Sequence, residues 1–220
     1  MAGGEGAEKH PAGSGRAFSA RILLNLAGFA PIAAGSNAFR PYIMPAAEQI
    51  TAVQIKENIA RAVTDVFKTM LGREPKLTPV NGADLDQVWP VQSPLADNPR
   101  PHVVGTVGFI GEANGLIYLY LDLGFARHCT CHLLGMTEDE LSEAGDEVIN
   151  DAIGELTNMT VGSFKNGLCD AGYTCKLTIP SILHGSNFTI EPISSVTRHI
   201  YHFDCSGHKI IADILMKQDE

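Results

Sequence analysis

The stretch HVVGTVGFIGEANGLIYLYLDL, residues 102–123, predicts a β-hairpin in the middle of the chain. Two runs rich in β-branched and aromatic residues flank GEANG, a short segment whose two glycines are typical of a turn. In the second run Tyr118 and Tyr120 fall on one face of the strand, while Ile117 and Leu119 fall on the other. Because both faces are apolar, we expect other parts of the protein to cover both sides of the hairpin.

Helical patterns lie on both sides of this hairpin. Before it, apolar residues recur every three or four positions, and after it two further segments show the same period. Gly72 and Gly135 each follow such a segment and are plausible helix stops. We expect helices over residues 46–71, 125–134 and 146–168, with a capping box formed by Thr137 and Glu140 before the last of them.

The rest of the chain reads as strands and connections. Prolines recur over residues 73–101, which predicts an irregular or edge-strand connection, with Trp89 as an anchor of a surface loop. The order of helix, hairpin, helices and then strands predicts an α+β fold in which helices pack on an antiparallel sheet. The expected C-terminal strands are TCKLTIPSIL (174–183), NFTIEPI (187–193), HIYHFDC (199–205) and KIIADILM (209–216), with a turn at Ser206 and Gly207.

Length and charge limit the possible functions. With 220 residues and 45% hydrophobic content, the chain can bury the core of one domain. We expect that domain to span residues 44–220 and residues 1–43 to be a poorly ordered extension or an artefact of the assumed start. The net charge of −9 argues against nucleic-acid binding, because an acidic surface repels phosphate backbones.

The cysteines and the apolar segments indicate where the protein works. Five cysteines form an odd set without a repeating spacing, which favours reduced thiols and a cytoplasmic location. The most hydrophobic N-terminal segment, residues 17–34, is interrupted by Arg21, Asn25 and Pro31. It is too broken to span a bilayer, so we expect no membrane segment.

The best functional clue is the segment DAIGELTN, residues 151–158. On a helix, Asp151, Glu155 and Asn158 fall within roughly 60° of one another, while the apolar side chains take the opposite face. Such a stripe can simply be a solvated helix face. The nearby Gly154 and Gly162 each cost about 1 kcal/mol of helix propensity, which suggests that something approaches this part of the helix closely.

The chemistry of the stripe limits what it can do. The Asn158 carboxamide carries a donor and an acceptor and can hold and orient a water molecule. The Glu155 carboxylate, one turn away, can bind a lysine or arginine of a partner. This pair suits a substrate that already has a metal and a good leaving group, because positioning then supplies most of the rate.

Other motifs offer weaker candidates. His128 and His132 would share one face of a helix, but Cys129 and Cys131 point elsewhere, so these four residues cannot form a tetrahedral metal site by themselves. A partial site completed from another segment remains an alternative. The chain contains no G-x-S-x-G, Walker-type or H-E-x-x-H motif.

Several of these segments resemble one family. Four segments are similar, in the same order along the chain, to segments of CheX in the CheC/CheX/FliY group of chemotaxis phosphatases. They are the hairpin, ARHCTCHLLGM, DEVINDAIGELTNMTVGSFKNGL and LTIPSILHG. The resemblance covers residues 50–216. Its key motif is Glu-x-x-Asn with an Asp or Ser four residues earlier, which Asp151, Glu155 and Asn158 satisfy. One position differs, because Lys176 stands where the longer motif has an Asn before Pro180.

This resemblance implies a CheC/CheX-like fold and dephosphorylation of the aspartyl phosphate on a CheY-like response regulator, in chemotaxis or a related two-component pathway. Asn158 would align the attacking water and Glu155 would pair with the regulator's lysine, with Asp151 in a supporting role. Mg²⁺ would belong to the regulator, and this chain would bind no cofactor. Homodimers that join their sheets are also implied. The alternative is a non-catalytic adaptor that docks on a receiver domain or a flagellar partner.

Overall fold

The computed structural model describes residues 21–24, 50–79, 95, 100–186, 189–192 and 196–217. Its centre is the predicted hairpin, formed by β3 (His102–Gly111) and β4 (Gly115–Asp122). The two strands pair antiparallel with Val107 opposite Ile117. As expected, both faces are covered, since Ile117 packs in one buried cluster and Tyr118 in another.

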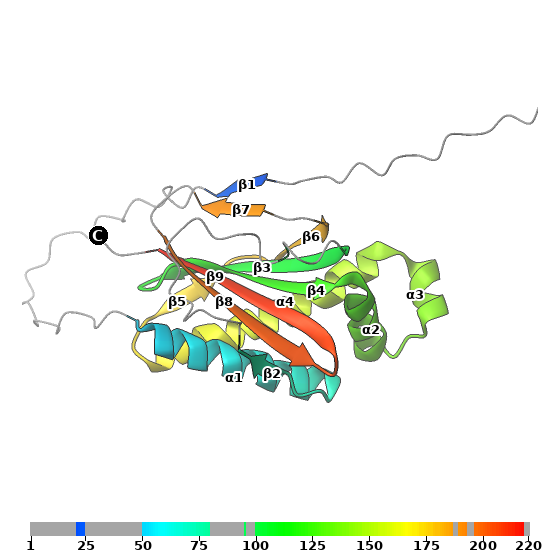
Figure 1. Cartoon of the computed structure of the whole chain (residues 1–220), viewed down its shortest axis with the longest axis horizontal. Coiled ribbons are helices and arrows are strands. Elements are labelled where there is room, and N and C mark those ends of the chain that lie inside the picture. Colours follow the sequence, from blue (N-terminus) through cyan, green and yellow to red (C-terminus); the bar gives the residue numbers. More distant parts are fainter. Residues whose placement is uncertain are drawn as a thin grey trace, which may run out of the picture.

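The hairpin forms the middle of a seven-stranded sheet (Figure 1). Its strand order is β2-β8-β9-β4-β3-β5, and β6 also pairs with β3. All neighbours in this sheet run antiparallel, which confirms the predicted α+β fold. The remaining strands of the sheet are β2 (Lys76–Thr78), β5 (Cys175–Leu177), β6 (Ser181–Gly185), β8 (Val196–Cys205) and β9 (His208–Lys217).

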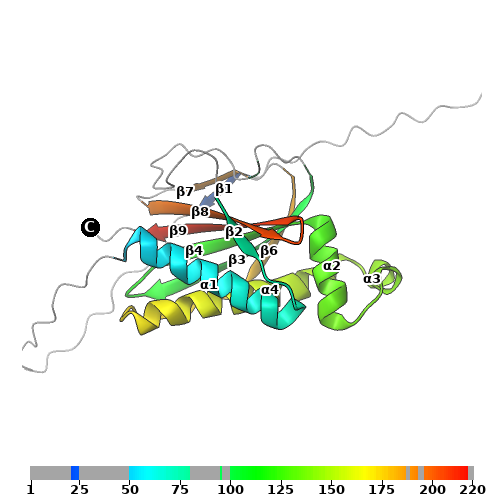
Figure 2. The same cartoon turned by 60° about the horizontal axis from the view of Figure 1, so that its bottom comes forward.

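The helices gather on one face of this sheet (Figure 2). They are α1 (Ala52–Leu71), α2 (Leu123–Leu134), α3 (Glu138–Ala144) and α4 (Asp146–Asp170). Side chains from α1, α2 and α4 fill the larger core with residues such as Phe67, Phe125 and Phe164, all of them fully buried. No helix in the described part of the chain is long and apolar enough to cross a membrane.

Capping residues set the helix boundaries, which correct two predictions. The first helix was expected from Ala46, but it begins at Ala52 because Thr51 and Gln54 form a capping box. The second begins at Leu123 rather than at Phe125, because the Asp122 carboxylate caps it. The capping box predicted at Thr137 and Glu140 is confirmed, as are the helix ends at Gly72 and Gly135, both in the left-handed conformation.

The opposite face of the sheet contains a buried ion pair. The Arg198 guanidinium donates to both Asp213 carboxylate oxygens, at 2.8 and 2.5 Å, and Tyr120 donates its hydroxyl to the same carboxylate. Burial, with the Asp213 charge beside it, raises the pKa of the Tyr120 phenol. This polar group lies within the second apolar cluster, so its members satisfy one another in place of water.

Some expectations concern residues outside the described part of the chain. Trp89 is one of them, and so are residues 46–49 of the expected first helix. Most of the proposed extension, residues 1–43, also lies outside it. Within that extension, β1 (Arg21–Leu24) pairs in parallel with β7 (Thr189–Pro192) as a separate two-stranded sheet.

Helix α4 lies on the sheet through a contact that only glycine permits. Gly105 of β3 faces Thr157 of α4, and a Cβ at Gly105 would overlap the Thr157 hydroxyl and lie 2.8 Å from its Cβ. Thr157 is fully buried and donates its hydroxyl to the Ile153 carbonyl at 2.7 Å, so it has no space to retreat. The Gly105–Thr157 contact therefore sets the height of α4 above the sheet.

A second close contact joins α4 to α1. The Asn58 side chain donates to the Phe164 carbonyl at 2.6 Å and lies directly over Gly167. A Cβ at Gly167 would lie 2.6 Å from the Asn58 Cγ atom. The two glycines thus let both neighbours approach α4 closely, and the helix is fixed against the sheet and against α1.

We predict that Gly105→Ala destabilises the protein by about 1–3 kcal/mol, because the added methyl group forces α4 away from β3. Gly154→Ala is the matched control, since a Cβ there would meet Ile182 at an ordinary 3.9 Å. That variant should gain about 0.5–1 kcal/mol from better helix propensity. Urea unfolding measures both effects. Equal stability of Gly105→Ala and the wild type would contradict this account of the contact.

Candidate functional site

The predicted stripe lies on the outer face of α4. Asp151 and Glu155 are exposed, and Asn158 is half-buried. On the opposite side of the helix Ile149, Ile153 and Leu156 are buried in the core. The structure therefore brings the three predicted side chains to one accessible surface, as helical periodicity indicates.

The stripe residues are free to act on a partner. Among the residues that the structure describes, the side chains of Asp151, Glu155 and Asn158 form no hydrogen bond or ion pair. Their helix, by contrast, is fixed by the contacts at Gly105 and Gly167. Thr157, which makes the first of these contacts, directly precedes Asn158 in the chain. A carboxylate and a carboxamide are therefore held on a rigid backbone with their polar atoms uncommitted.

The glycines at 154 and 162 suggested that another body approaches α4 closely, but their nearest neighbours belong to this chain. A Cβ at Gly154 would lie 3.9 Å from the Ile182 side chain, and one at Gly162 would lie 3.8 Å from Leu177. Both distances are ordinary van der Waals contacts. The glycines thus face this chain's own strands β6 and β5, and neither marks a place where only a hydrogen atom fits.

Two surface residues near the stripe were not singled out from the sequence. His184 of β6 contacts the Asn150 side-chain oxygen through its ring Nε2 atom. Ile179, between β5 and β6, is 87% exposed. The only sequence signal for Ile179 was the following Pro180, which interrupts an apparent strand.

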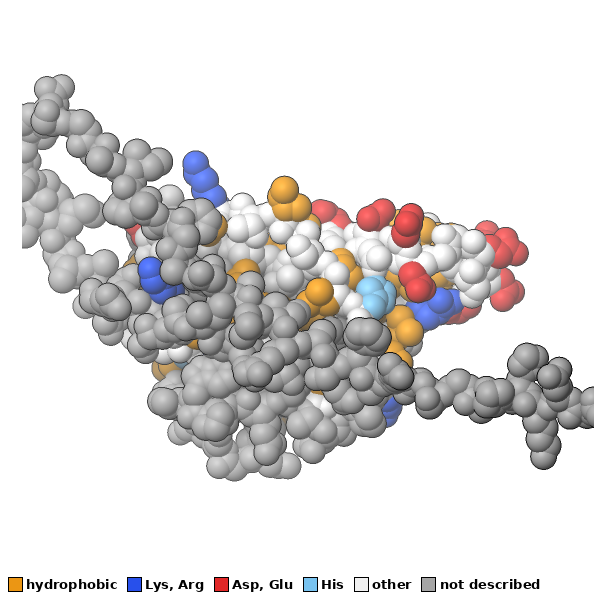
Figure 3. Space-filling view, turned by 90° about the horizontal axis from the view of Figure 1, so that it is seen from above, with side chains coloured by type: hydrophobic (Ala, Val, Ile, Leu, Met, Phe, Trp, Pro, Cys, Tyr) orange, Lys and Arg blue, Asp and Glu red, His pale blue; other side chains and the backbone are white. Residues whose placement is uncertain are grey.

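Acidic residues gather at one end of this surface. In the view from above they cluster at the end of the molecule that holds α3, with a histidine and hydrophobic side chains beside them (Figure 3). The first turn of α3 contributes Glu138, Asp139 and Glu140, and the first turn of α4 contributes Asp146 and Glu147. A partner that docks along α4 therefore meets a negative surface near the helix N-terminus.

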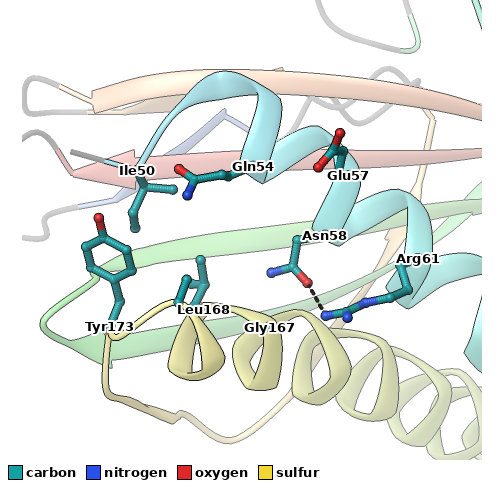
Figure 4. A pocket seen from close by; sticks show the side chains of 9 residues that line it. Ile50, Gln54, Glu57, Asn58, Arg61, Gly167, Leu168 and Tyr173 are labelled. Carbon is teal, nitrogen blue, oxygen red and sulfur yellow. Dashed lines mark hydrogen bonds between the residues drawn. The ribbon is translucent and has the colours of Figure 1, made fainter. Parts of the chain in front are cut away.

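A pocket lies at the other end of α4, away from the stripe. It has a volume of about 320 Å³ and is formed by the N-terminal half of α1 and the C-terminal end of α4. Figure 4 shows Asn58 reaching across it, with its oxygen accepting a hydrogen bond from Arg61 at 3.1 Å. None of its lining residues belongs to the stripe. The predicted site is thus on an open helix face, which suits the recognition of another protein surface.

The alternative metal site at His128 and His132 gains no further ligand from the described residues. Both histidines are exposed on α2, and the His128 Nε2 atom contacts the Arg73 guanidinium at 2.6 Å. Desolvation and the nearby positive charge of Arg73 lower the pKa of His128. In the described part of the chain, no three His, Cys, Asp or Glu side chains are grouped so as to bind a metal ion. All five cysteines are free thiols.

Comparisons with known proteins agree with this fold. Residues 103–204, which include the whole of α4, match the family model of chemotaxis phosphatase CheX. No curated protein matches the chain.

Three crystal structures illustrate the likeness. CheX from Desulfovibrio desulfuricans has a TM-score of 0.59 at 22% identity, with 74% of this chain and 99% of that chain covered. CheX from Vibrio vulnificus gives 0.59 at 23% identity, with 79% and 100% covered. A chain of the CheX–CheY–BeF3–Mg²⁺ complex from Borrelia burgdorferi gives 0.52 at 19% identity, with 74% and 98% covered.

At these identities the structural matches establish a shared fold, and the family model independently selects the same group from the sequence. Together they agree with the resemblance that the motifs indicate: this chain has the CheC/CheX-like fold, and residues 103–204 are similar to the chemotaxis phosphatase CheX family.

Proposed function

We propose that this chain hydrolyses the aspartyl phosphate of a CheY-like receiver domain, in chemotaxis or a related two-component pathway. The observation that carries the proposal is the pair Glu155 and Asn158, one turn apart on a rigid helix and without partners among the described residues. The CheX family model and the similarity to a chain of a CheX–CheY complex support the choice of substrate.

Asn158 is the residue that we assign to the reaction itself. Its carboxamide oxygen accepts a hydrogen bond from a water molecule and directs a lone pair of that water at phosphorus. The water oxygen bonds to phosphorus as the bond between phosphorus and the aspartate oxygen breaks. The products are a free aspartate carboxylate and inorganic phosphate, which takes up the protons of the water. The carboxamide transfers no proton, so its contribution is orientation.

Glu155 is the residue that we assign to docking. Its exposed carboxylate lies three positions before Asn158, on the same helix face. A lysine of the receiver that binds this carboxylate brings the phosphorylated aspartate next to Asn158. Asp151, a further turn away, has a supporting role, because its exposed carboxylate adds negative charge to the same helix face.

The remaining components belong to the partner. The receiver binds Mg²⁺, which stabilises the negative charge of the phosphoryl oxygens during transfer. No grouping of His, Cys, Asp and Glu in the described residues of this chain offers a metal site of its own. The proposal also places the protein in the cytoplasm, where its five free thiols remain reduced.

Pairing of two copies through the sheet is part of the same proposal. The resemblance to CheX implies such pairing, and the antiparallel sheet of this chain supplies the strands that it needs.

We predict that Asn158→Ala lowers the turnover rate of phosphorylated receiver by about 100-fold or more, because the attacking water loses its orientation. The experiment phosphorylates the receiver domains of the same organism and follows the loss of phosphate with and without this protein. Circular dichroism checks that the variant remains folded. Turnover like that of the wild type in the Asn158→Ala variant would exclude this mechanism. A wild-type protein that binds the receiver but leaves the phosphate lifetime unchanged would be an adaptor.

A different kinetic effect is expected at Glu155. The variant Glu155→Lys should raise KM by tenfold or more through repulsion of the receiver's lysine, with a smaller change in kcat. Glu147→Lys is the matched control, since it makes the same charge change about two turns earlier on α4 and leaves Glu155 in place. If both variants change KM equally, the effect comes from the overall charge of the surface, and the assignment of Glu155 is wrong.

Sedimentation velocity tests the pairing of copies. We expect a mass of twice the 23.6 kDa of one chain. A wild-type protein that sediments as a monomer at all concentrations contradicts pairing through the sheet.

A further inference from the structure

The strand beside α4 contains a one-residue bulge. Leu177 of β5 pairs with Phe109 of β3, and Ser181 of β6 pairs with Thr106. Three residues, 178–180, therefore face only two residues of β3, 107 and 108. A β-bulge of this kind bends the strand and turns a side chain away from the direction that regular pairing gives it.

This bulge is firmly attached to the sheet. Thr178 donates its backbone N–H to the Gly108 carbonyl at 2.9 Å, and Gly108 donates its own N–H to the Thr178 hydroxyl, also at 2.9 Å. Pro180 restricts the backbone on the other side. Between these two fixed residues Ile179 extends into solvent, and its 87% exposure is the highest among the exposed large hydrophobic side chains of the described residues.

The contacts of α4 with its neighbouring strands locate the bulge relative to Asn158. Gly154 faces Ile182, just after the bulge, and Gly162 faces Leu177, just before it. Asn158 lies midway between these two glycines, about one helical turn from each. The bulge therefore runs alongside the part of α4 that carries Asn158.

We propose that Ile179 is a docking residue for the receiver domain and packs against an apolar side chain of the receiver beside its phosphorylated aspartate. This inference rests on the proposed function. A receiver whose phosphorylated aspartate reaches Asn158 must lie over the exposed face of α4, and the adjacent bulge presents Ile179 to the same body.

The chemistry of such a contact differs from that of the acidic stripe. Glu155 selects a positive charge, whereas Ile179 gains free energy only when an apolar surface covers it. A single exposed isoleucine is common on protein surfaces. Here, however, a bulge held by two hydrogen bonds fixes its position beside Asn158. Once covered, the side chain also keeps bulk water away from the edge of the reacting site.

Binding in a catalytically impaired background tests this inference separately from catalysis. The probe is a receiver domain from the same organism, chosen because the wild-type chain binds it. This receiver domain is phosphorylated with acetyl phosphate. Its affinity is measured for Asn158→Ala and for Asn158→Ala combined with Ile179→Ser. The second substitution should weaken binding by about tenfold, because it removes most of an apolar contact of isoleucine size. Ile179→Leu in the same background should restore most of the affinity.

Val53→Ser in the Asn158→Ala background is the matched control, since Val53 is also hydrophobic and 63% exposed but lies on α1. It should leave the affinity unchanged. The inference is wrong if the affinity is the same with and without Ile179→Ser. It is also wrong if Val53→Ser lowers the affinity as much as Ile179→Ser does, or if the wild type binds no receiver. Weaker binding by Ile179→Ser, with no acceleration of phosphate loss by the wild type, refutes the proposed hydrolysis and supports the docking contact.

Discussion

The contact between Gly105 and Thr157 is the constraint on which the site depends. It lets a buried threonine of α4 lie directly on the backbone of the central hairpin, where a larger residue than glycine would push the helix away. Because Asn158 follows Thr157, a shift of the helix at this point would move the carboxamide by the same amount. Protein interiors are closely packed and resist such shifts, so the glycine in β3 controls the position of a side chain about 100° further around the helix.

The two faces of the sheet have different physical characters. The face covered by the helices is filled with apolar side chains, and the interlocking of those side chains positions α4. The other face buries Arg198, Asp213 and Tyr120 in a group whose hydrogen bonds require one particular arrangement. A buried pair of this kind adds little net stability, but loss of one partner leaves an uncompensated charge. This polar group opposes slippage of β8 along β9, since a shift in register would separate Arg198 from Asp213.

The sequence predicted what depends on local rules and missed what depends on register. The stripe at Asp151, Glu155 and Asn158 follows from helical geometry alone, and the capping box at Thr137 follows from side-chain chemistry. The segment TCKLTIPSIL, by contrast, reads as one strand of 174–183 but forms two, with a bulge between them. Only its pairing with β3 reveals the extra residue. Likewise, the spacing of Gly154 and Gly162 could not show that their neighbours come from the same chain.

The isolation of Glu155 and Asn158 from the rest of the described structure has a consequence for how such proteins change over generations. Side chains that form no internal bonds contribute little to folding, so their replacement leaves stability nearly untouched. Under the proposed function, a lineage could therefore lose hydrolysis through a single substitution at Asn158 and still retain a folded protein that binds the receiver. The proposed hydrolysis and the proposed binding could then separate without any change to the core, and gene duplication would need few steps to divide them between two descendants.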